Sequence, residues 1–370
     1  MTVHAAHDNR NRYAVPVLRQ TVRDIYLAYG FSADDSEIVA DSLVFTDVNG
    51  IESHGVQRLS MYDRKVRRGK VRVHADSEIV HETPLSATID AHFSMGQVAG
   101  AKAMKLAIAK AQAHGIGFVV VRNSNHYGAS GYYAQLAAQQ GLIGISSTNT
   151  TPGVLPLFST QEYLGTNPIA FAVPAEPHPF FFDAATSCVA QGKVELYAKR
   201  HEPLPATWVV DRQYRTITDA EAAVPKLDAK TGEFALVPLG GVSEYTGGHK
   251  GYGFSMVVEL LTGILAQGHL SHESKESDIN TALCHNFIAV DPALFGDREA
   301  IYRRFSQFLD EVRALPPVEG HRVYVHGDKE AIAREERTAH GIPLYPQTED
   351  EIHEIMRRLG LDTTQFAPLV

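Results

Sequence analysis

Residues 118–147, FVVVRNSNHYGASGYYAQLAAQQGLIGISS, decide the fold class of this chain. The apolar run at 118–122 predicts a strand, the Ala-rich segment at 129–140 predicts a helix that ends at Gly141, and residues 142–147 predict a second strand. This alternation is typical of a βαβ unit. However, no G-x-G-x-x-G sequence follows a predicted strand anywhere in the chain, which argues against a doubly wound dinucleotide-binding domain.

The segments on either side of this unit predict more strands and several helices. Residues 169–173 and 180–182 read as strands joined by a proline-rich turn, which favours antiparallel pairing. Further strands are expected at 78–82, 86–90, 287–290 and 322–326, and residues 200–248 are expected to form loops with short strands. Helices are predicted after residue 16 and at 33–48, 56–68, 97–114, 189–199, 254–266, 298–315, 329–340 and 349–359. Ser32 is the expected N-cap of the helix at 33–48, and Thr348 with Glu351 has the spacing of a capping box for the last helix.

Length, charge and cysteine content limit the function classes. The 370 residues suit two or three domains. The 34 Lys and Arg residues are outnumbered by 43 Asp and Glu residues, and the net charge of −9 disfavours general binding to nucleic acid. Cys188 and Cys284 cannot make a disulfide framework, which fits a reducing compartment. No apolar run is long enough to span a bilayer and no signal-peptide pattern is present, so we expect a cytoplasmic protein without a membrane partner.

The most informative polar segment is Glu52-Ser53-His54-Gly55-Val56-Gln57-Arg58, with Tyr62 beyond it. If one helix runs through this segment, His54, Arg58 and Tyr62 follow one another at four-residue steps and share a face. A proton-carrying imidazole beside a guanidinium that can clamp a carboxylate suits a 2-oxo-acid or 2-hydroxy-acid site. The alternative is a helix start with an incidental histidine and a surface arginine.

Three other segments are candidates for ligand binding. The loop at 123–133 lies between a predicted strand and helix, where a ligand anion can meet a helix N-terminus; alternatively it is a capped turn with His126 hydrogen-bonded into it. Residues 164–169, with Asn-Pro, are typical of a turn, and residues 183–187, with Asp, Thr and Ser, are typical of a helix N-cap. The glycines around Lys250 at 247–253 can cradle phosphates, although this is not a P-loop. The 18 histidines include no paired metal-binding motif, so no metal is expected, and the absence of G-x-S-x-G disfavours a serine hydrolase.

Five motifs occur in order and together carry a resemblance: Ser53-His54-Gly55-Val56-x-Arg58-Leu59, Asn123-Ser124-Asn125-His126-Tyr127-Gly128, Leu164-Gly165-Thr166-Asn167-Pro168, Asp183-x-Ala185-Thr186-Ser187 and His249-Lys250-Gly251-Tyr252-Gly253. With them the chain resembles the malate/L-lactate dehydrogenase family of the non-Rossmann kind, from about Tyr13 to about Leu361. The resemblance implies an α+β fold with a non-Rossmann nicotinamide-binding domain around a mainly antiparallel sheet. It also implies a helical domain built from both chain ends, and a homodimer. The corresponding domains are residues 1–122 completed by 285–370, which form the helical and substrate segment, and residues 123–284, which bind the cofactor.

The resemblance also implies the site residues. His54, Ser53 and His126 match catalytic positions, with either histidine as the proton donor. Arg58, Tyr62, Thr166 and Asn167 are the expected substrate-binding residues. The expected contacts to NAD or NADP are Thr150, Asp183, Ala184, Ala185, Lys250, Gly327, Asp328 and Lys329.

The expected function is the interconversion of a 2-hydroxy acid and its 2-oxo acid, of the malate, lactate or sulfolactate type, by hydride transfer with NAD or NADP. A ureidoglycolate dehydrogenase or a reductase of a cyclic imine is the runner-up. Lys193 stands where the imine-reducing relatives tend to carry an acidic residue, which favours the hydroxy-acid reading. A non-catalytic ligand-binding relative is the remote alternative. The preference between NAD and NADP is not predicted.

Overall fold

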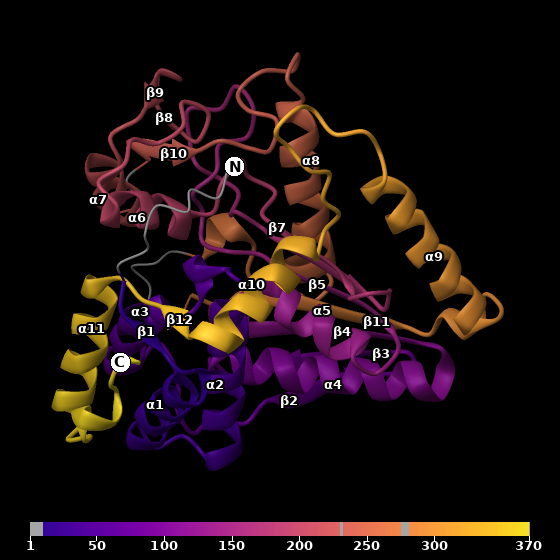
Figure 1. Ribbon diagram of the computed structural model, residues 1–370, viewed down its shortest axis with the longest axis horizontal. Coiled ribbons are helices and arrows are strands. Elements are labelled where there is room, and N and C mark those ends of the chain that lie inside the picture. Colours follow the sequence, from indigo (N-terminus) through magenta and orange to yellow (C-terminus); the bar gives the residue numbers. More distant parts are fainter. Residues whose placement is uncertain (1–9, 230–231, 275–280, 370) are drawn as a thin grey trace. The chain divides into compact units, whose positions relative to one another are not determined.

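The computed structural model describes residues 10–229, 232–274 and 281–369 (Figure 1). The chain divides into two compact units. The first unit comprises the described residues up to Arg67 together with those from Lys329 onward, and the second comprises those from Arg68 to Asp328.

The first unit is helical and joins both ends of the chain. Its helices are α1 (Val15–Ala28), α2 (Ala33–Val48), α3 (Leu59–Arg67), α10 (Asp328–His340) and α11 (Pro346–Arg358), with a short turn η6 (Thr363–Gln365). The helix α2 begins where the sequence predicts, because the Ser32 side chain accepts a hydrogen bond from the Asp35 amide at 3.1 Å. Strands β1 (Arg12–Tyr13) and β12 (Ile342–Pro343) pair antiparallel, and the Tyr13 ring stacks on Phe366 at 4.3 Å. The structure thus has a helical unit built from both chain ends, but its bounds are narrower than the predicted 1–122 and 285–370, because residues 68–122 and 285–328 belong to the second unit.

The second unit is built on a seven-stranded sheet. The strands are β2 (Glu78–Glu82), β3 (Ser86–Asp90), β4 (Ile116–Ser124), β5 (Ile143–Thr148), β6 (Ile169–Val173), β7 (Phe180–Ala184) and β11 (Leu283–Val290), in the order β2-β3-β4-β11-β5-β6-β7. Of these neighbouring pairs, β3 with β4 is parallel and the others are antiparallel. The predicted mainly antiparallel sheet is confirmed. The strands of the predicted βαβ unit, β4 and β5, run in the same direction, but β11 lies between them.

Helices pack closely on this sheet because two strands carry a glycine at the contact. The long helix α4 (Gly96–His114) packs on β4 and β11, and α5 (Ser130–Ala138) packs on β5 and β6 (Figure 1). A Cβ atom on Gly117 of β4 would lie 2.0 Å from the Ala107 carbonyl oxygen, and one on Gly144 of β5 would lie 2.1 Å from that of Ala134. These two glycines therefore allow the helix backbones to approach the sheet.

A smaller sheet lies between β7 and α8 in the sequence. It has three strands, β8 (Val209–Asp211), β9 (Thr216–Ile217) and β10 (Phe234–Leu236), in the order β10-β8-β9. Helices α6 (Gln191–Lys199) and α7 (Ala220–Ala229) share a buried apolar cluster with it, which includes Val194, Leu227 and Leu236. The short strands were predicted, but α7 was missed because Pro225 lies inside it.

Two predicted helix starts are wrong. The helix α8 (Gly248–Glu259) begins six residues before the predicted start and passes into a π-helical turn, η3 (Leu260–Ile264). Gly248 and Gly251 permit this, since a Cβ atom at either residue would lie 2.1 or 2.0 Å from a carbonyl oxygen of the neighbouring segment. The predicted capping box at Thr348 is also wrong, because Pro346 opens α11 and Tyr345 is its N-cap.

The predicted strand at 322–326 is wrong as well. This segment is irregular, and one backbone hydrogen bond, from Phe181 N–H to the His326 carbonyl, joins it to the edge of β7 at 3.2 Å. The remaining described elements are η1 (Glu52–His54), η2 (Val56–Arg58), η4 (Ser271–Glu273), η5 (Pro292–Leu294) and α9 (Arg298–Arg313). Within the described ranges, no helix combines the length and apolar character needed to cross a membrane.

Candidate active site

Ser53, His54 and Arg58 form a compact group between α2 and α3. Two single-turn 3₁₀ helices, η1 and η2, meet at Gly55, so the predicted continuous helix is wrong and His54 and Arg58 do not share one helical face. They are instead connected through Ser53. The Ser53 hydroxyl lies 2.9 Å from Nδ1 of His54, and Nε of Arg58 donates a hydrogen bond to the Ser53 carbonyl at 2.7 Å. The structure therefore brings the three residues together by a route that helical spacing did not predict.

The junction at Gly55 is held by Asp47, which the sequence analysis missed. The Asp47 carboxylate accepts a hydrogen bond from the Val56 amide at 2.7 Å, and a Cβ atom on Gly55 would lie 1.8 Å from its Oδ1. Arg337 of α10 donates to the Asp47 carbonyl and to Glu52, each at 2.6 Å. Burial raises the pKa of Asp47 to about 7, although the Val56 hydrogen bond and Arg337 oppose that rise. The sequence offered one indication of this role, namely an acidic residue close to the end of α2.

The electrostatics of this group favour a neutral histidine. Burial, and next the positive charge of Arg58, lower the pKa of His54 to about 3. His54 can therefore accept a proton at neutral pH. Tyr62, the fourth residue predicted here, lies in α3 with 1% of its side chain exposed.

His126 lies in the loop between β4 and α5 in the second unit. The Gly128 amide donates to its Nδ1 at 3.3 Å, so a neutral His126 ring carries its proton on Nε2. The preceding Asn125 is buried and its amide donates to the carbonyls of Lys70, Phe93 and Ser94, which fixes the loop. Both readings of this segment therefore have support, because it is a hydrogen-bonded turn that presents a histidine.

Asp183 stands at the end of β7 and faces the start of α5. Its Oδ2 accepts a hydrogen bond from the Gly131 amide at 2.7 Å, in the first turn of that helix. A carboxylate at a helix N-terminus is stabilised by the helix dipole. Ala184 and Ala185 follow it, and Thr186 N–H then donates to the Thr166 carbonyl at 2.9 Å. This bond brings the segment at 183–186 next to the one at 164–167.

Thr150, Thr166 and Asn167 form a second compact group. The Thr150 amide donates to Oδ1 of Asn167 at 3.1 Å, and the Thr166 amide donates to Oγ1 of Thr150 at 3.0 Å. Nδ2 of Asn167 donates to Glu259 at 2.8 Å, and the Asn167 side chain has no exposed surface. The structure thus brings these three predicted residues together. It adds Glu259, Asn149 and Ser271 to them, which no motif in the sequence had indicated.

Lys250 provides a positive charge at the first turn of α8. Its side chain is exposed, and no acidic side chain in the described residues forms an ion pair with it. Lys250 precedes Ser255 by five residues, a rise of about 7.5 Å along a helix. The Ser255 carbonyl accepts a hydrogen bond from Asn167 at 3.3 Å, so α8 contacts the group of Thr150, Thr166 and Asn167 one to two helical turns after Lys250. A cation at the positive end of a helix suits the phosphates of a nicotinamide dinucleotide.

The predicted residues 327–329 include one buried carboxylate. Asp328 is 3% exposed and accepts hydrogen bonds from Arg313 at 2.9 and 3.1 Å, and Nε2 of His178 lies 3.0 Å from it. The hydrogen bonds from Arg313, in spite of burial, lower the pKa of Asp328. Gly327 has a φ of 106° and packs against the Pro179 carbonyl, whereas Lys329 is exposed. Asp328 therefore anchors this segment.

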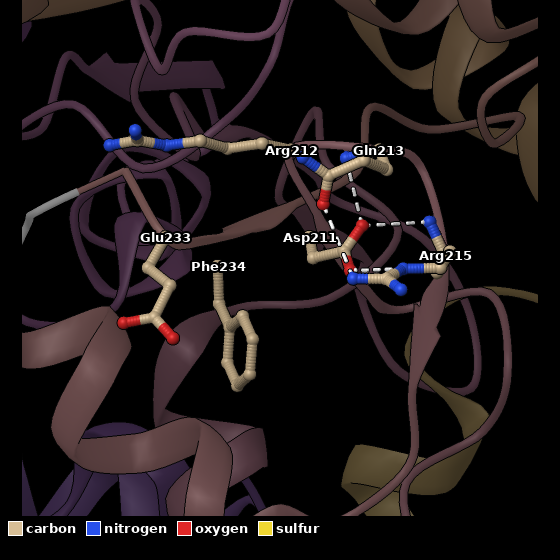
Figure 2. A pocket seen from close by; sticks show the side chains of 6 residues that line it. All are labelled: Asp211, Arg212, Gln213, Arg215, Glu233 and Phe234. Carbon is tan, nitrogen blue, oxygen red and sulfur yellow. Dashed lines mark hydrogen bonds and ion pairs between the residues drawn. The ribbon is translucent and has the colours of Figure 1, made fainter.

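A surface pocket lies elsewhere in the second unit. It has a volume of about 440 Å³ and lies on the three-stranded sheet (Figure 2). Asp211 at its centre accepts hydrogen bonds from the Gln213 and Arg215 amides and from the Arg215 side chain, so the turn itself satisfies this carboxylate. None of the predicted site residues line this pocket. The lining residues are Asp211, Arg212, Gln213, Arg215, Glu233 and Phe234.

Comparison with known proteins assigns this fold to a class of dehydrogenases. The family model described as malate/L-lactate dehydrogenase matches residues 14–353. The malate dehydrogenase of Pyrococcus abyssi is 43% identical over 336 residues, 90% of each chain. The L-sulfolactate dehydrogenase of Methanocaldococcus jannaschii is 32% identical over 351 residues, 94% of this chain and 97% of that one. The crystal structure of malate dehydrogenase from Entamoeba histolytica superposes with a TM-score of 0.92 at 31% identity, over 96% of this chain and 99% of that one.

The chain belongs to the malate/L-lactate dehydrogenase family. It is an oxidoreductase that acts on a CH–OH group, as its sequence predicted.

Proposed function

We propose that the protein interconverts a short 2-hydroxy acid and its 2-oxo acid with NAD or NADP, and that malate is the model for its substrate. The arrangement of Arg58 and His54 around Ser53 carries this proposal. Arg58 supplies the fork that binds a carboxylate, and His54 supplies the group that exchanges the proton of the hydroxyl. The identity of 43% to a malate dehydrogenase favours malate over sulfolactate, for which the reported relative is 32% identical.

The residues of this chain orient the substrate and move its proton. Arg58, which already donates to the Ser53 carbonyl, holds the carboxylate, and Ser53 fixes the orientation of the His54 ring. Because its pKa is lowered, His54 is neutral at neutral pH and keeps an unprotonated ring nitrogen that can take the hydroxyl proton when the hydroxy acid is oxidised. A substrate carboxylate beside Arg58 offsets the positive charge that disfavours imidazolium, so substrate binding makes protonation of His54 easier in the reductive direction. His126 is the alternative proton donor, and Tyr62, Thr166 and Asn167 complete the proposed substrate contacts.

All but one of the proposed cofactor contacts lie in the second unit, and Lys329 belongs to the first. Lys250 suits the phosphates, and Thr150, Asp183, Ala184, Ala185, Gly327, Asp328 and Lys329 are proposed to line the rest of the binding site, with residues 123–284 as the cofactor-binding region. When bound, the reduced cofactor supplies the hydride. The assay therefore includes both NADH and NADPH.

The runner-up is a ureidoglycolate dehydrogenase or a cyclic-imine reductase. Lys193 weighs against the imine reaction, because its ammonium lies over the Trp208 ring, 5.8 Å from the centroid, where the imine-reducing relatives tend to have an acid. A non-catalytic binding protein remains the remote alternative. It gains no support from a group in which Ser53, His54 and Arg58 are connected to one another.

We also propose a homodimer in the cytoplasm. The support is an apolar surface on α8 and η3, where Phe254, Val257, Leu260 and Ile264 are 57%, 46%, 48% and 52% exposed. Exposed apolar residues at such spacing on one helix mark a contact surface. Sedimentation or light scattering that gives twice the mass of 40.5 kDa supports the dimer, and a single-chain mass contradicts it.

The function is tested by following NADH and NADPH oxidation with malate-, lactate- and sulfolactate-type 2-oxo acids and with a cyclic imine. We expect the highest kcat/KM with a 2-oxo acid. His54→Ala and His126→Ala then assign the proton donor, since the donor's removal is expected to lower kcat by about 10²–10⁴-fold. Turnover with the imine alone selects the runner-up, and turnover with none of the substrates refutes the proposal.

A further inference from the structure

Glu259 is a buried carboxylate that has no cationic partner among the described residues. It lies at the last residue of α8, where the helix passes into the π-helical turn η3, and only 6% of its surface is exposed. Within residues 10–229, 232–274 and 281–369, no lysine, arginine or histidine forms an ion pair with it. A buried charge of this kind needs hydrogen bonds to be stable.

The groups around this carboxylate are donors. Nδ2 of Asn167 donates to Oε1 at 2.8 Å, and the Ser271 hydroxyl donates to the same oxygen. The Ser271 amide donates to Oε2 at 3.3 Å, and Nδ2 of Asn149 approaches that oxygen at 3.4 Å. Asn149, Asn167 and Ser271 are each at most 1% exposed. Because donors face both oxygens, the side chain at this position must accept hydrogen bonds with both, as a carboxylate does.

The carboxylate thereby determines how the Asn167 amide is oriented. With Nδ2 donating to Glu259, Oδ1 is left as the acceptor; it accepts the Thr150 amide at 3.1 Å and lies 3.2 Å from the Ser271 hydroxyl. Oγ1 of Thr150 in turn accepts the Thr166 amide at 3.0 Å. Asn167 has a φ of 35°, so its backbone also depends on support from its neighbours.

Asn149, which the carboxylate contacts at 3.4 Å, ties the end of β5 to β11. Oδ1 of Asn149 accepts the Cys284 amide at 2.8 Å, while its Nδ2 donates to the His269 carbonyl at 2.8 Å. Through Asn149, Asn167 and Ser271, Glu259 therefore connects the segments that flank Thr150 with α8, which carries Lys250. A π-helical turn directly after such a residue is a frequent feature of functional sites.

We propose that Glu259 is a positioning residue of the dehydrogenase. It acts through Asn167 and sets the relative placement of Thr150 and Thr166, and it does not itself touch substrate or cofactor. The inference rests on the proposed function, in which Thr150 contacts the dinucleotide and Thr166 contacts the acid. It adds to that function a buried residue outside the five sequence motifs.

The test is Glu259→Gln, which keeps the size of the side chain and turns one acceptor into a donor. In one orientation the new amide group faces Nδ2 of Asn167 and the Ser271 hydroxyl, and in the other it faces the Ser271 amide and Nδ2 of Asn149. A donor therefore meets a donor either way, and the hydrogen bonds that orient the Asn167 amide are weakened. We expect NADH, titrated by its fluorescence, to bind about tenfold more weakly, the loss typical of one charge-assisted hydrogen bond. We also expect a higher KM for the 2-oxo acid. The matched control is Asp211→Asn, which removes a buried carboxylate hub from the three-stranded sheet and is expected to lower Tm without changing NADH affinity.

A reciprocal exchange separates positioning from a general loss of stability. In the double variant Glu259→Gln with Asn167→Asp, the amide and the carboxylate change places, so residue 259 donates to residue 167. The carboxylate at 167 still accepts the Thr150 amide. We expect the double variant to recover at least half of the lost NADH affinity on a logarithmic scale. Asn167→Asp alone places two carboxylates next to each other, so we expect it to bind NADH more weakly than Glu259→Gln or the double variant.

The outcomes distinguish this inference from the proposed function. If the wild-type protein neither binds NADH nor reduces a 2-oxo acid, the proposed function fails. If the wild type is active and a folded Glu259→Gln variant binds NADH within twofold of it, the inference is overturned. It is also overturned if the loss of affinity follows Tm across all variants and the exchange restores nothing. Should Glu259→Gln not fold, Ser271→Ala removes one hydroxyl donor only, and a change below twofold in its NADH affinity overturns the inference.

Discussion

Replacing Gly55 with alanine tests whether the tight junction between η1 and η2 determines the positions of the two proposed catalytic residues, His54 and Arg58. A Cβ atom there would lie 1.8 Å from Oδ1 and 2.1 Å from Cγ of Asp47, so the carboxylate or the turn must move. Either movement breaks the 2.7 Å bond from the Val56 amide, and hydrogen bonds to charged groups contribute about 1.5–3 kcal/mol. Because η1 carries His54 and η2 carries Arg58, their separation changes with the junction. A displacement of about 1 Å costs on the order of 100-fold in rate.

The assay is kcat/KM for NADH-dependent reduction of a 2-oxo acid, together with Tm for each variant. We expect Gly55→Ala to lose about 100-fold in kcat/KM. Adding Asp47→Ala removes the atoms that clash, so the double variant is expected to be more active than the product of the two single effects. Gly253→Ala is the stability control, because a Cβ atom there meets nothing within 4 Å and alanine favours the helix, so its Tm is expected to rise. Near-normal turnover of Gly55→Ala refutes the reasoning.

Three further predictions concern pH, cofactor and assembly. Burial lowers the pKa of His285 to about 3 from an unfolded value of 6.5, so the contribution of the neutral ring to stability is full above pH 6.5 and falls by about 1.4 kcal/mol per pH unit towards pH 3. In urea unfolding between pH 7 and pH 5, the free energy of unfolding should therefore fall less steeply in His285→Gln than in the wild type. Equal slopes in the two proteins contradict this prediction. Lys250→Met should weaken NADH binding about tenfold and reduce its salt dependence, measured by titration at low and high ionic strength; unchanged affinity removes Lys250 from the site. If the protein forms the proposed dimer, Leu260→Asp, at a residue 48% exposed, should convert it to single chains in light scattering, and an intact dimer excludes this surface as the contact.

Local signals in the sequence predicted much of the fold. Ser32 starts α2 and Gly115, with a φ of 89°, ends α4, because caps and left-handed glycines act within a few residues. The proline-rich turn between β6 and β7 likewise indicated their antiparallel pairing. The insertion of β11 between β4 and β5 was not predictable, since that pairing joins residues more than 130 positions apart.

The sequence indicated candidate site residues, but it did not predict how they are arranged. The resemblance indicated Ser53, His54 and Arg58, whereas the helical spacing that was expected to align them is interrupted at Gly55. Asp47 and Glu259 escaped notice because each acts on a backbone or amide group far along the chain, and a carboxylate in the sequence does not reveal whether it is buried. Long-range support of this kind becomes visible only in the folded chain.

The most direct measurement of the central claim compares one 2-oxo acid with its uncharged amide as substrates, in the wild type and in Arg58→Lys. If Arg58 binds the carboxylate as a two-pronged donor, the wild type prefers the acid, and the lysine variant loses most of that preference while its activity on the amide stays similar. Equal preference for the acid in both proteins contradicts the account.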